Sequence, residues 1–523
     1  MILPNQQQDN PSNPSSDYHA MAGYWALTDA LLGGTATMRA AGEKYLPKFE
    51  AESNESYAER KDHCRFTNIF SDILENLAQK PVGTEVSVSD DASNDIKDFC
   101  EDVDGKGNSL HVFAGTTMFN GIAKAVDYIL VDYTGTQSTD GKVRSIADEK
   151  KMGLRPKWCT YPADSVLAAY SDMVDGKEEF VHVRLKENSI VRDGWKEKTV
   201  ERVRVLNREP VTDEQGNITG YGPATWEIWK KNEKSTATVK KEDWSKEQEG
   251  TISIGVIPFV PFIAGRRKGN SWQFMPPMQR AAELQVEYYQ QENSLKSIKN
   301  SAAFPILSGN GISPDIGEDG EPKRLVVGPK TVLYAPNEGQ TTQASWAFVE
   351  PEAQSLTFLA SDLKEIGKEL RELGRQPLTA QSGNLTVVTT AFAAQKGHTA
   401  IQAWCFNLKD ALENALYYTC LWLKITDDKA EVNINTDFDI GIGDDESFKD
   451  VIDLYKEDVI SRDQLIHEGK RRGIIDKDYD PDDDLEKILE EYENSLEGDD
   501  GEDPDKKPDD DLDDDPTKPQ TDD

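Results

Sequence analysis

The chain has 523 residues, which is longer than one hydrophobic core usually organises, so two or more structural regions are expected. Its 96 acidic and 59 basic residues give a formal net charge of −37, which argues against a protein that grips nucleic acid tightly. Transient contact stays open, because an acidic protein can surround DNA that must slide past it.

The first part of the chain is predicted to be helical after a short polar arm. Residues 1–16 lack the blocks of a signal peptide and are expected to be disordered. Gly33 and Gly34 should end a first helix, and a later helix over 110–126 should lead into a strand over 128–133. Two apolar faces at helical spacing precede it, formed by Tyr24, Trp25, Leu27, Ala30 and Leu31, and by Phe66, Ile69, Phe70, Ile73, Leu74 and Leu77.

The middle of the chain changes to a period of two. Apolar and polar residues alternate over 180–185, 202–205 and 225–228, which is typical of half-buried strands. With turns at 193–194 and 215–217 between such runs, residues 155–265 are predicted to form an antiparallel sheet or a small barrel. A strand over 252–263, interrupted by Pro258 and Pro261, should close this region.

Two long helical blocks follow, at 276–300 and 350–374, and each should form a rod of roughly 37 Å. Between them, residues 301–349 are predicted to form a small β-rich module, with a hairpin around Gly328-Pro329 and a further strand at 344–349. Because a lone rod with an apolar seam must cover it, head-to-tail packing into a ring is expected. The seam consists of Leu356, Leu359, Leu363, Ile366, Leu370 and Leu373.

A polar stretch, 375–390, joins the second rod to a long helix over 391–423, for which a kink is expected at Gly397. Its apolar side consists of Ala393, Ala400, Ile401, Trp404, Leu408, Ala411, Leu412, Ala415 and Leu416. Short helices should follow from Glu446, one of them capped by Ser461 with Gln464. Residues 497–523 carry 14 acidic and 3 basic side chains and are expected to be disordered.

Motifs for chemistry are missing from the sequence. It contains no GxxxxGK[ST] loop, HExxH helix or GxSxG elbow, and its histidines show no metal-ligand spacing. We therefore expect no enzyme activity, no catalytic residues, no cofactor and no bound metal. Five cysteines without a CxxC pair and the lack of a membrane-length apolar run favour a soluble protein in a reducing compartment. Basic clusters lie at 266–268, 296 with 299, 323–324 and 470–472.

The order of these elements resembles the portal proteins of tailed bacteriophages, the head-to-tail connector family. Local sequence agrees at 255–261 (GVIPFVP), at the helix 278–299, at 304–309 (FPILSG) and over 17–47. The resemblance spans residues 17–490 and implies an α+β portal-type fold. Its parts would be the wing (17–270), first stem helix (271–300), clip (301–349), second stem helix (350–374), tunnel loop (375–390), long kinked helix with its return to the wing (391–445) and helical crown (446–496), between the arm and the acidic tail.

The resemblance also implies a function and partners. A ring of twelve subunits would occupy one capsid vertex of the virion, after assembly in the cytoplasm of the bacterial host. Double-stranded DNA would pass through it during packaging and ejection. Its partners would be the terminase large subunit, adaptor and tail proteins, and the major capsid and scaffolding proteins, with no membrane. The site residues would be Arg375, Gln376, Thr379, Gln381, Ser382 and Asn384 in the tunnel loop, Lys296 and Lys299 in the stem channel, and Lys323 and Arg324 in the clip, facing a docking partner.

Three alternatives stay open. The chain could be another head-assembly protein without a DNA channel. A metal-dependent nuclease could use an acidic cluster such as 90–91, 444–446 or 482–484. The acidity could also reflect salt adaptation of an ordinary globular protein.

Overall fold

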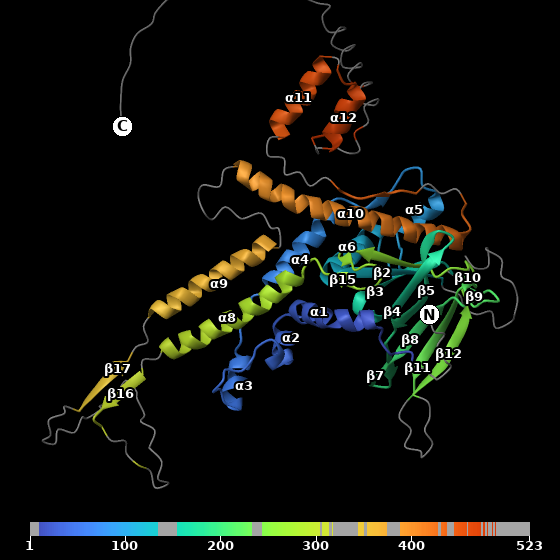
Figure 1. Cartoon of the computed structure of the whole chain (residues 1–523). Coiled ribbons are helices and arrows are strands. Elements are labelled where there is room, and N and C mark those ends of the chain that lie inside the picture. The colour runs from blue at the N-terminus through green and yellow to red at the C-terminus, as the bar shows by residue number, and fades with distance from the viewer. Residues whose placement is uncertain are drawn as a thin grey trace, which may run out of the picture. The chain divides into compact units, whose positions relative to one another are not determined.

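The computed structural model describes residues 10–133, 154–232, 243–303, 306–312, 316, 344–349, 353–373, 387–426, 430–436, 444–457 and 459–471, with single positions between 474 and 487. The chain divides into two compact units, Met1–Ile440 and Gly441–Asp523, and each is described by itself. Helices and strands are both abundant in the first unit, so the expected α+β class is confirmed (Figure 1).

The first unit begins with helices whose ends are set by local residues. The Ser15 hydroxyl accepts a hydrogen bond from the Tyr18 N–H at 3.2 Å and caps α1 (Ser16–Leu32), which stops at Gly33 as predicted. The Asn68 side chain caps α4 (Ile69–Gln79) in the same way, through the Ser71 N–H at 3.1 Å. The other helices here are α2 (Gly34–Ala41), α3 (Asn54–Asp62), α5 (Asn94–Cys100) and α6 (Leu110–Lys124), the last confirming the helix expected near 110–126.

Two open antiparallel sheets follow, with strand orders β12-β11-β8-β5-β4 and β13-β2-β3. The sheet predicted for the middle of the chain is confirmed, and neither sheet closes into a barrel. Shorter pairs are β6–β7, β9–β10, β14–β15 and β1–β18. The larger sheets contain β2 (Val126–Tyr133), β3 (Pro156–Pro162), β4 (Val166–Val174), β5 (Lys177–Lys186), β8 (Arg202–Asn207), β11 (Thr225–Lys231), β12 (Trp244–Thr251) and β13 (Phe259–Ile263). The pairs contain β1 (Ser87–Val88), β6 (Ser189–Asp193), β7 (Lys196–Val200), β9 (Pro210–Thr212), β10 (Ile218–Tyr221), β14 (Arg266–Arg267), β15 (Phe274–Met275) and β18 (Val432–Asn433).

The strand predicted over 252–263 was placed too early, because β13 begins only at Phe259. Before it the chain turns: Gly255 has a φ of +80°, and its N–H donates to the Ile252 carbonyl at 2.9 Å. Pro261 lies within β13 without breaking the sheet. It is tolerated because β13 is an edge strand, whose neighbour in the sheet is β2 alone.

The remaining elements of the first unit are α8 (Gln279–Ala303), β16 (Ile306–Asn310), β17 (Ser345–Val349), α9 (Ala353–Leu373) and α10 (Val387–Leu423). The two predicted rods correspond to α8 and α9, and β17 confirms the strand expected at 344–349. The hairpin expected around 328–329 lies outside the described residues. α10 begins at Val387, four residues before the long helix was expected, so the end of the predicted 375–390 loop is helical. α10 runs through Gly397 as one helix, and the kink predicted there stays a prediction.

The apolar seam of α9 does not belong to a lone rod. Ile366 and Leu370 are buried, and Leu356, Leu359 and Leu363 are half-buried. The seam is covered inside the same chain, because α9 packs along α8 and against α4 (Figure 1). The ring was inferred because the seam was expected to be uncovered in a single chain, and that expectation was wrong. A ring must therefore be supported by other features of the chain.

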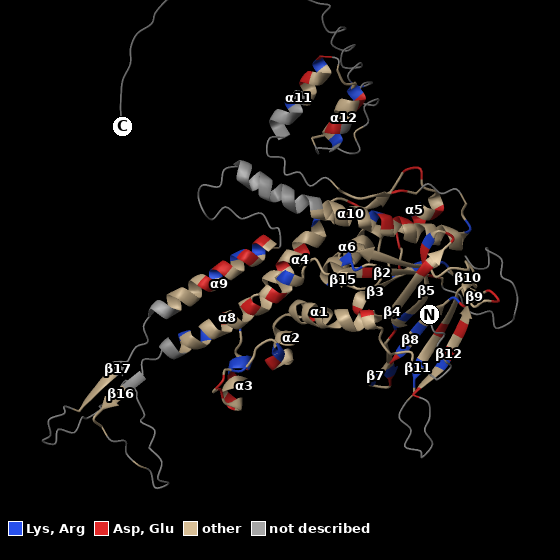
Figure 2. Cartoon of the chain, viewed as in Figure 1, with Lys and Arg blue, Asp and Glu red and all other residues tan. Residues whose placement is uncertain are grey.

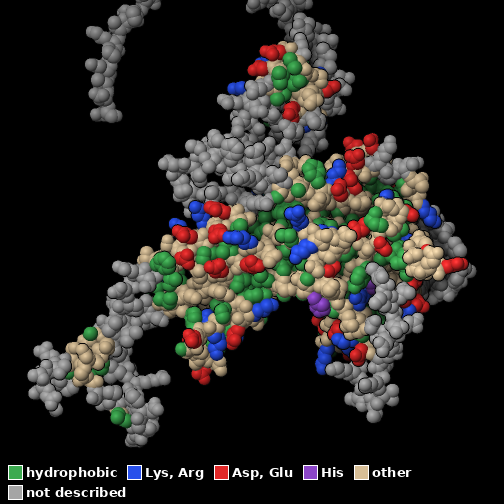
Figure 3. All heavy atoms as spheres, viewed as in Figure 1, with side chains coloured by type: hydrophobic (Ala, Val, Ile, Leu, Met, Phe, Trp, Pro, Cys, Tyr) green, Lys and Arg blue, Asp and Glu red, His purple; other side chains and the backbone are tan. Residues whose placement is uncertain are grey.

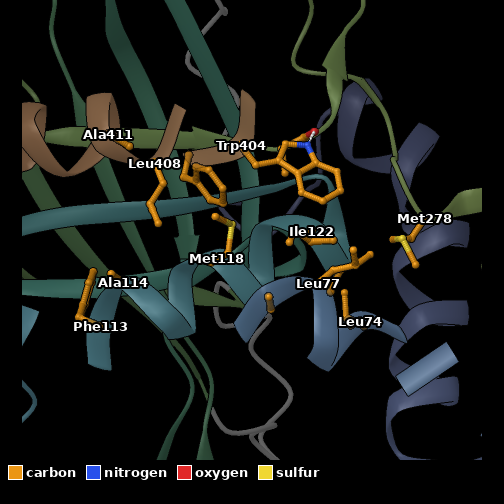
Figure 4. Close-up of a cluster of buried hydrophobic side chains, with 14 of the residues drawn as sticks. Leu74, Leu77, Phe113, Ala114, Met118, Ile122, Met278, Trp404, Leu408 and Ala411 are labelled. Carbon is orange, nitrogen blue, oxygen red and sulfur yellow. Dashed lines mark hydrogen bonds between the residues drawn. The ribbon is translucent and has the colours of Figure 1, made fainter. Parts of the chain in front are cut away.

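The core lies where α10 crosses the β13-β2-β3 sheet and α6. Trp404, Leu408 and Ala411 of α10 point toward Met118 and Ile122 of α6 (Figure 4). Of the predicted apolar side of α10, the residues from Ile401 to Leu416 are buried and Ala400 is half-buried. The side chain of Ala393 lies outside the described residues.

The second unit contains α11 (Asp444–Lys456) and α12 (Arg462–Arg471) among its described residues. The expected cap of α12 is confirmed, since the Ser461 hydroxyl accepts from the Gln464 N–H at 3.2 Å. The predicted acidic tail lies outside the described residues.

Candidate functional site

The candidate site is a helical arm made of α8 and α9 with β16 and β17 at its far end (Figure 1). α8 has 25 residues and α9 has 21, so their lengths are about 37 and 31 Å. The two helices lie side by side in opposite directions. β16 and β17 pair antiparallel, with Ile306 opposite Val349 and Asn310 opposite Ser345. The arm therefore carries a two-stranded sheet whose outer edges have no neighbour among the described residues.

A polar network fixes α8 to the segment that joins α3 to α4. The Asn293 side chain accepts from the Arg65 N–H and donates to the Arg65 carbonyl, both at 2.8 Å. The buried Gln285 amide accepts from the Phe70 N–H and donates to the Thr67 carbonyl, both at 3.0 Å. These contacts satisfy backbone groups of Arg65 and Thr67, which lie between the two helices, and the N–H of Phe70 in the first turn of α4, where no helical acceptor is available.

The same network contains a partly buried ion pair. The Glu292 carboxylate accepts from the Thr67 N–H at 3.1 Å and from the Thr67 hydroxyl at 2.7 Å, and the Arg65 guanidinium lies 3.0 Å away. We call residues 63–70 together with Gln285, Glu292, Asn293 and Lys296 the α8 anchor. The sequence did not reveal it, because these α8 residues look like an ordinary polar helix face.

Lys296 and Lys299, expected to line a channel, differ in their surroundings. The Lys296 ammonium donates to the His63 carbonyl at 2.5 Å, so it takes part in the α8 anchor. Lys299 is exposed near the end of α8. Lys323, Arg324 and the whole stretch with Arg375, Gln376, Thr379, Gln381, Ser382 and Asn384 lie outside the described residues.

The surface charge of the described part is mixed. Basic and acidic side chains alternate along α9 (Figure 2), and on the face drawn in Figure 3 both signs are interspersed rather than gathered into a basic field. Arg267, from the cluster at 266–268, pairs with both carboxylate oxygens of Glu178 at 2.8 Å and lies 4.1 Å from the centre of the Trp272 ring. This part of the surface therefore offers no field for tight binding of phosphates.

A pocket of about 220 Å³ opens between the β-rich part and α10. Its lining combines apolar and aromatic side chains with polar ones: Phe180, Phe259, Val260, Pro261, Ile263 and Trp272, and Ser171, Glu178, Glu179, Arg267, Asn414 and Tyr418. Burial raises the pKa of the Tyr418 hydroxyl to about 12. The lining of the pocket comes from three separate stretches of the sequence, so no local pattern could have predicted it.

The described ranges give no basis for catalysis by a metal centre. Within them, no three His, Cys, Asp or Glu side chains gather closely enough to hold a metal ion. None of the helices in those ranges combines the length and apolar character needed to span a bilayer.

The part of the chain that contains the arm is similar to a known sequence family. A family model described as a domain of unknown function, DUF4055, matches residues 277–423, from the start of α8 to the end of α10. No curated protein sequence matches the chain.

Solved structures from gene transfer agent (GTA) particles are loosely similar to the model. The first comes from the neck of an empty GTA particle computed with C6 symmetry, with 10% identity, a TM-score of 0.39 and coverage of 75% of this chain and 87% of that chain. The second comes from the neck of the native particle computed with C12 symmetry, with 10% identity, a TM-score of 0.37 and coverage of 73% and 84%. The third comes from the virion of the native particle, with 11% identity, a TM-score of 0.34 and coverage of 86% and 98%.

Proposed function

We propose that the chain is a portal protein of a tailed phage or phage-like particle, which forms a ring of twelve subunits at one capsid vertex and conducts double-stranded DNA. The observation that carries the proposal is the arm. Two antiparallel helices lead to a terminal two-stranded sheet and back, and a 37-residue helix then crosses the body of the fold. This order is what the resemblance implies for stem, clip, stem and long helix.

The terminal sheet supports association of several copies. Two-stranded sheets are marginally stable alone in water, and their open edges pair readily with further strands. In a ring, β16 or β17 of one subunit would extend the sheet of its neighbour, which buries those edges without a partner of another kind. Lys323 and Arg324, between the two strands in sequence, would face the terminase and later the adaptor.

The stretch 375–390 would form the tunnel loop. Its last four residues already belong to α10, which begins at Val387, so residues 375–386 would make the loop itself. The stretch contains no Asp or Glu, in a chain that has 96 of them. Short polar side chains there would contact phosphates weakly, and Arg375 would add one attractive contact per subunit. Weak contacts suit a duplex that slides, because each strong ion pair would add friction as well as affinity.

A head-assembly protein without a channel is the second candidate, since the arm by itself would also suit a bundle of subunits without a bore. A nuclease has less support, because no described group of side chains offers a metal site. Native mass spectrometry and negative-stain images of the purified protein at micromolar concentration test the proposal. We expect closed rings with an open centre. Monomers alone would refute the portal function, and closed bundles without a bore would favour the second candidate.

A further inference from the structure

One surface element has no role in the fold. The β6–β7 hairpin projects from the larger sheet, and its residues from Ile190 to Thr199 are all exposed. At its tip Gly194, with a φ of +62°, forms the tight turn that presents Trp195. Trp195 is 99% exposed, and Ile190 is 70% exposed. The Arg192 guanidinium of the same hairpin lies 5.8 Å from the centre of the Trp195 ring. An indole that is otherwise in water is an unusual use of a large apolar side chain.

The pocket between the sheets and α10 is the matching concave feature. Its volume of about 220 Å³ is below the roughly 300–1,000 Å³ of small-molecule sites, so it suits one large side chain better than a cofactor. Phe180, Phe259 and Trp272 give the lining an aromatic part, and the Arg267 guanidinium, also in the lining, stacks on Trp272. A second indole entering the pocket would gain both apolar burial and a cation–π contact.

Charge favours the same pairing. The hairpin carries three cations, Arg192, Lys196 and Lys198, against the carboxylates Asp193 and Glu197, whereas the chain as a whole has a net charge of −37. The pocket lining contains two carboxylates, Glu178 and Glu179, which are paired with Arg267 and Arg208. A hairpin with a basic balance is thus attracted to another copy of this chain through that copy's overall negative charge rather than through the pocket itself.

Trp195 cannot fill the pocket of its own chain. The pocket residues Glu178–Phe180 lie near the start of β5, whereas the hairpin follows the end of β5 and continues the β5–β8 pair through the hydrogen bond from Glu187 N–H to the Arg202 carbonyl at 2.8 Å. The chain runs from Phe180 through six more residues of β5 and the five-residue strand β6 before it reaches the tip of the hairpin. At the rise of a β-strand, this places the tip roughly 35 Å from the pocket. Figure 1 shows β7 at the end of the strands away from α10.

We infer that Trp195 of one subunit inserts into the pocket formed by β5, β13 and α10 of the next. A projection and a pocket at opposite ends of one sheet make a head-to-tail contact, which closes into a ring when repeated around an axis. This inference rests on the proposed function, which supplies the ring and its number of subunits, and it adds a specific contact between neighbouring subunits.

The test compares Trp195→Ala with Val112→Ala, a control at a 49% exposed apolar residue of α6 that does not line the pocket. Native mass spectrometry over a dilution series gives the concentration at which half the chains are in rings. We expect Trp195→Ala to raise it at least about tenfold, as hot-spot tryptophans do, and Val112→Ala to leave it unchanged. Circular dichroism should be the same for both variants, because Trp195 buries nothing in the monomer.

A disulfide trap tests the contact directly. The double variant Trp195→Cys with Asn414→Cys should give covalent chain-to-chain ladders under mild oxidation of assembled protein, whereas Val112→Cys with Asn414→Cys should not. Rings that tolerate Trp195→Ala and give no ladder would overturn this inference and leave the portal function standing. A wild-type protein that stays monomeric would overturn both.

Discussion

At the scale of single residues, Asp127 is the carboxyl whose surroundings differ most from water. It is completely buried at the start of β2, and this burial raises the pKa of its side chain from 3.8 to about 8. The neutral Asn120 amide donates to it at 3.3 Å and the Tyr128 backbone donates a further hydrogen bond, while the nearby Lys124 ammonium binds Asp29 and Asp164 at 2.8 and 2.6 Å. These surroundings favour the protonated carboxyl of Asp127 in the folded protein at neutral pH.

This shift predicts a specific pH dependence of stability. Because the folded-state pKa is raised, the unfolded chain releases the Asp127 proton first, and folding stability should fall as pH rises from 3.8 to about 8 and then level off. The Asp127→Asn variant should lack this decrease in unfolding free energy, which amounts to about 1 kcal/mol per pH unit. Urea unfolding of both proteins at about pH 5, 7 and 9 measures it. Parallel profiles would show that Asp127 is ionised in the folded state.

A second residue-scale prediction concerns two glycines of α6. A Cβ at Gly121 would lie 2.3 Å from the Phe262 ring, whereas one at Gly115 would meet Val82 at 3.7 Å, an ordinary contact. Gly121→Ala should therefore cost about 1–3 kcal/mol of unfolding free energy through overpacking. Gly115→Ala should gain up to about 1 kcal/mol from helix propensity. Equal thermal midpoints for the two variants would contradict this view of the α6–β13 contact.

At the scale of elements, the α8 anchor should determine how firmly the arm is attached. Asn293→Ala leaves the N–H and carbonyl of Arg65 without their α8 partner, which should cost about 1–3 kcal/mol. Hydrogen exchange should rise at Thr67 and Phe70, whose amides donate to neighbouring α8 side chains. Gln279→Ala, at an exposed position of the same helix, is the control and should change neither quantity. Unchanged exchange in Asn293→Ala would mean that the segment is held by other contacts.

The elements predicted from periodicity and those missed differ in a physical way. α6, β5, β8, α9 and α10 follow from repeats of 3.6 or 2 residues, because each buries one face of a regular element. The α8 anchor could not be predicted, since it joins residues more than 200 positions apart through polar side chains that a helix also exposes to water. The pocket could not be predicted either, because its lining comes from stretches that are far apart in the sequence. The start of β13 was predicted too early because apolar residues at 252–257 are buried in a turn rather than in a strand.

At the scale of the whole molecule, the proposed channel makes the 375–390 stretch the point of contact with DNA. Replacing Gln376, Thr379 and Gln381 by Glu adds three negative charges per subunit where the sequence has none. We expect rings to assemble normally and DNA packaging or retention to fall, because like charge repels the phosphates. Packaging of a labelled duplex by assembled particles measures this.

The control for that variant adds the same charge elsewhere. Thr212, Gln215 and Gln248 are exposed in the β-rich part, and their replacement by Glu changes composition and net charge identically. Packaging should be unaffected. If both triple variants package DNA as the wild type does, the loop does not meet the duplex.

The different attachment of the two arm helices has a mechanical consequence. Hydrogen bonds are short-ranged and directional, so α8, held by its anchor, is a stiff support that yields only when its bonds break. The α9 seam is held to α8 and α4 by apolar contact, which has no preferred direction, and one exposed ion pair joins Arg280 of α8 to Glu369 of α9 at 2.9 Å. Because apolar residues recur along that seam every three or four positions, we expect a load along the arm to displace α9 by one turn, about 5.4 Å, into similar contacts once that ion pair opens. Under tension α8 should therefore keep its position, and α9 should move along it.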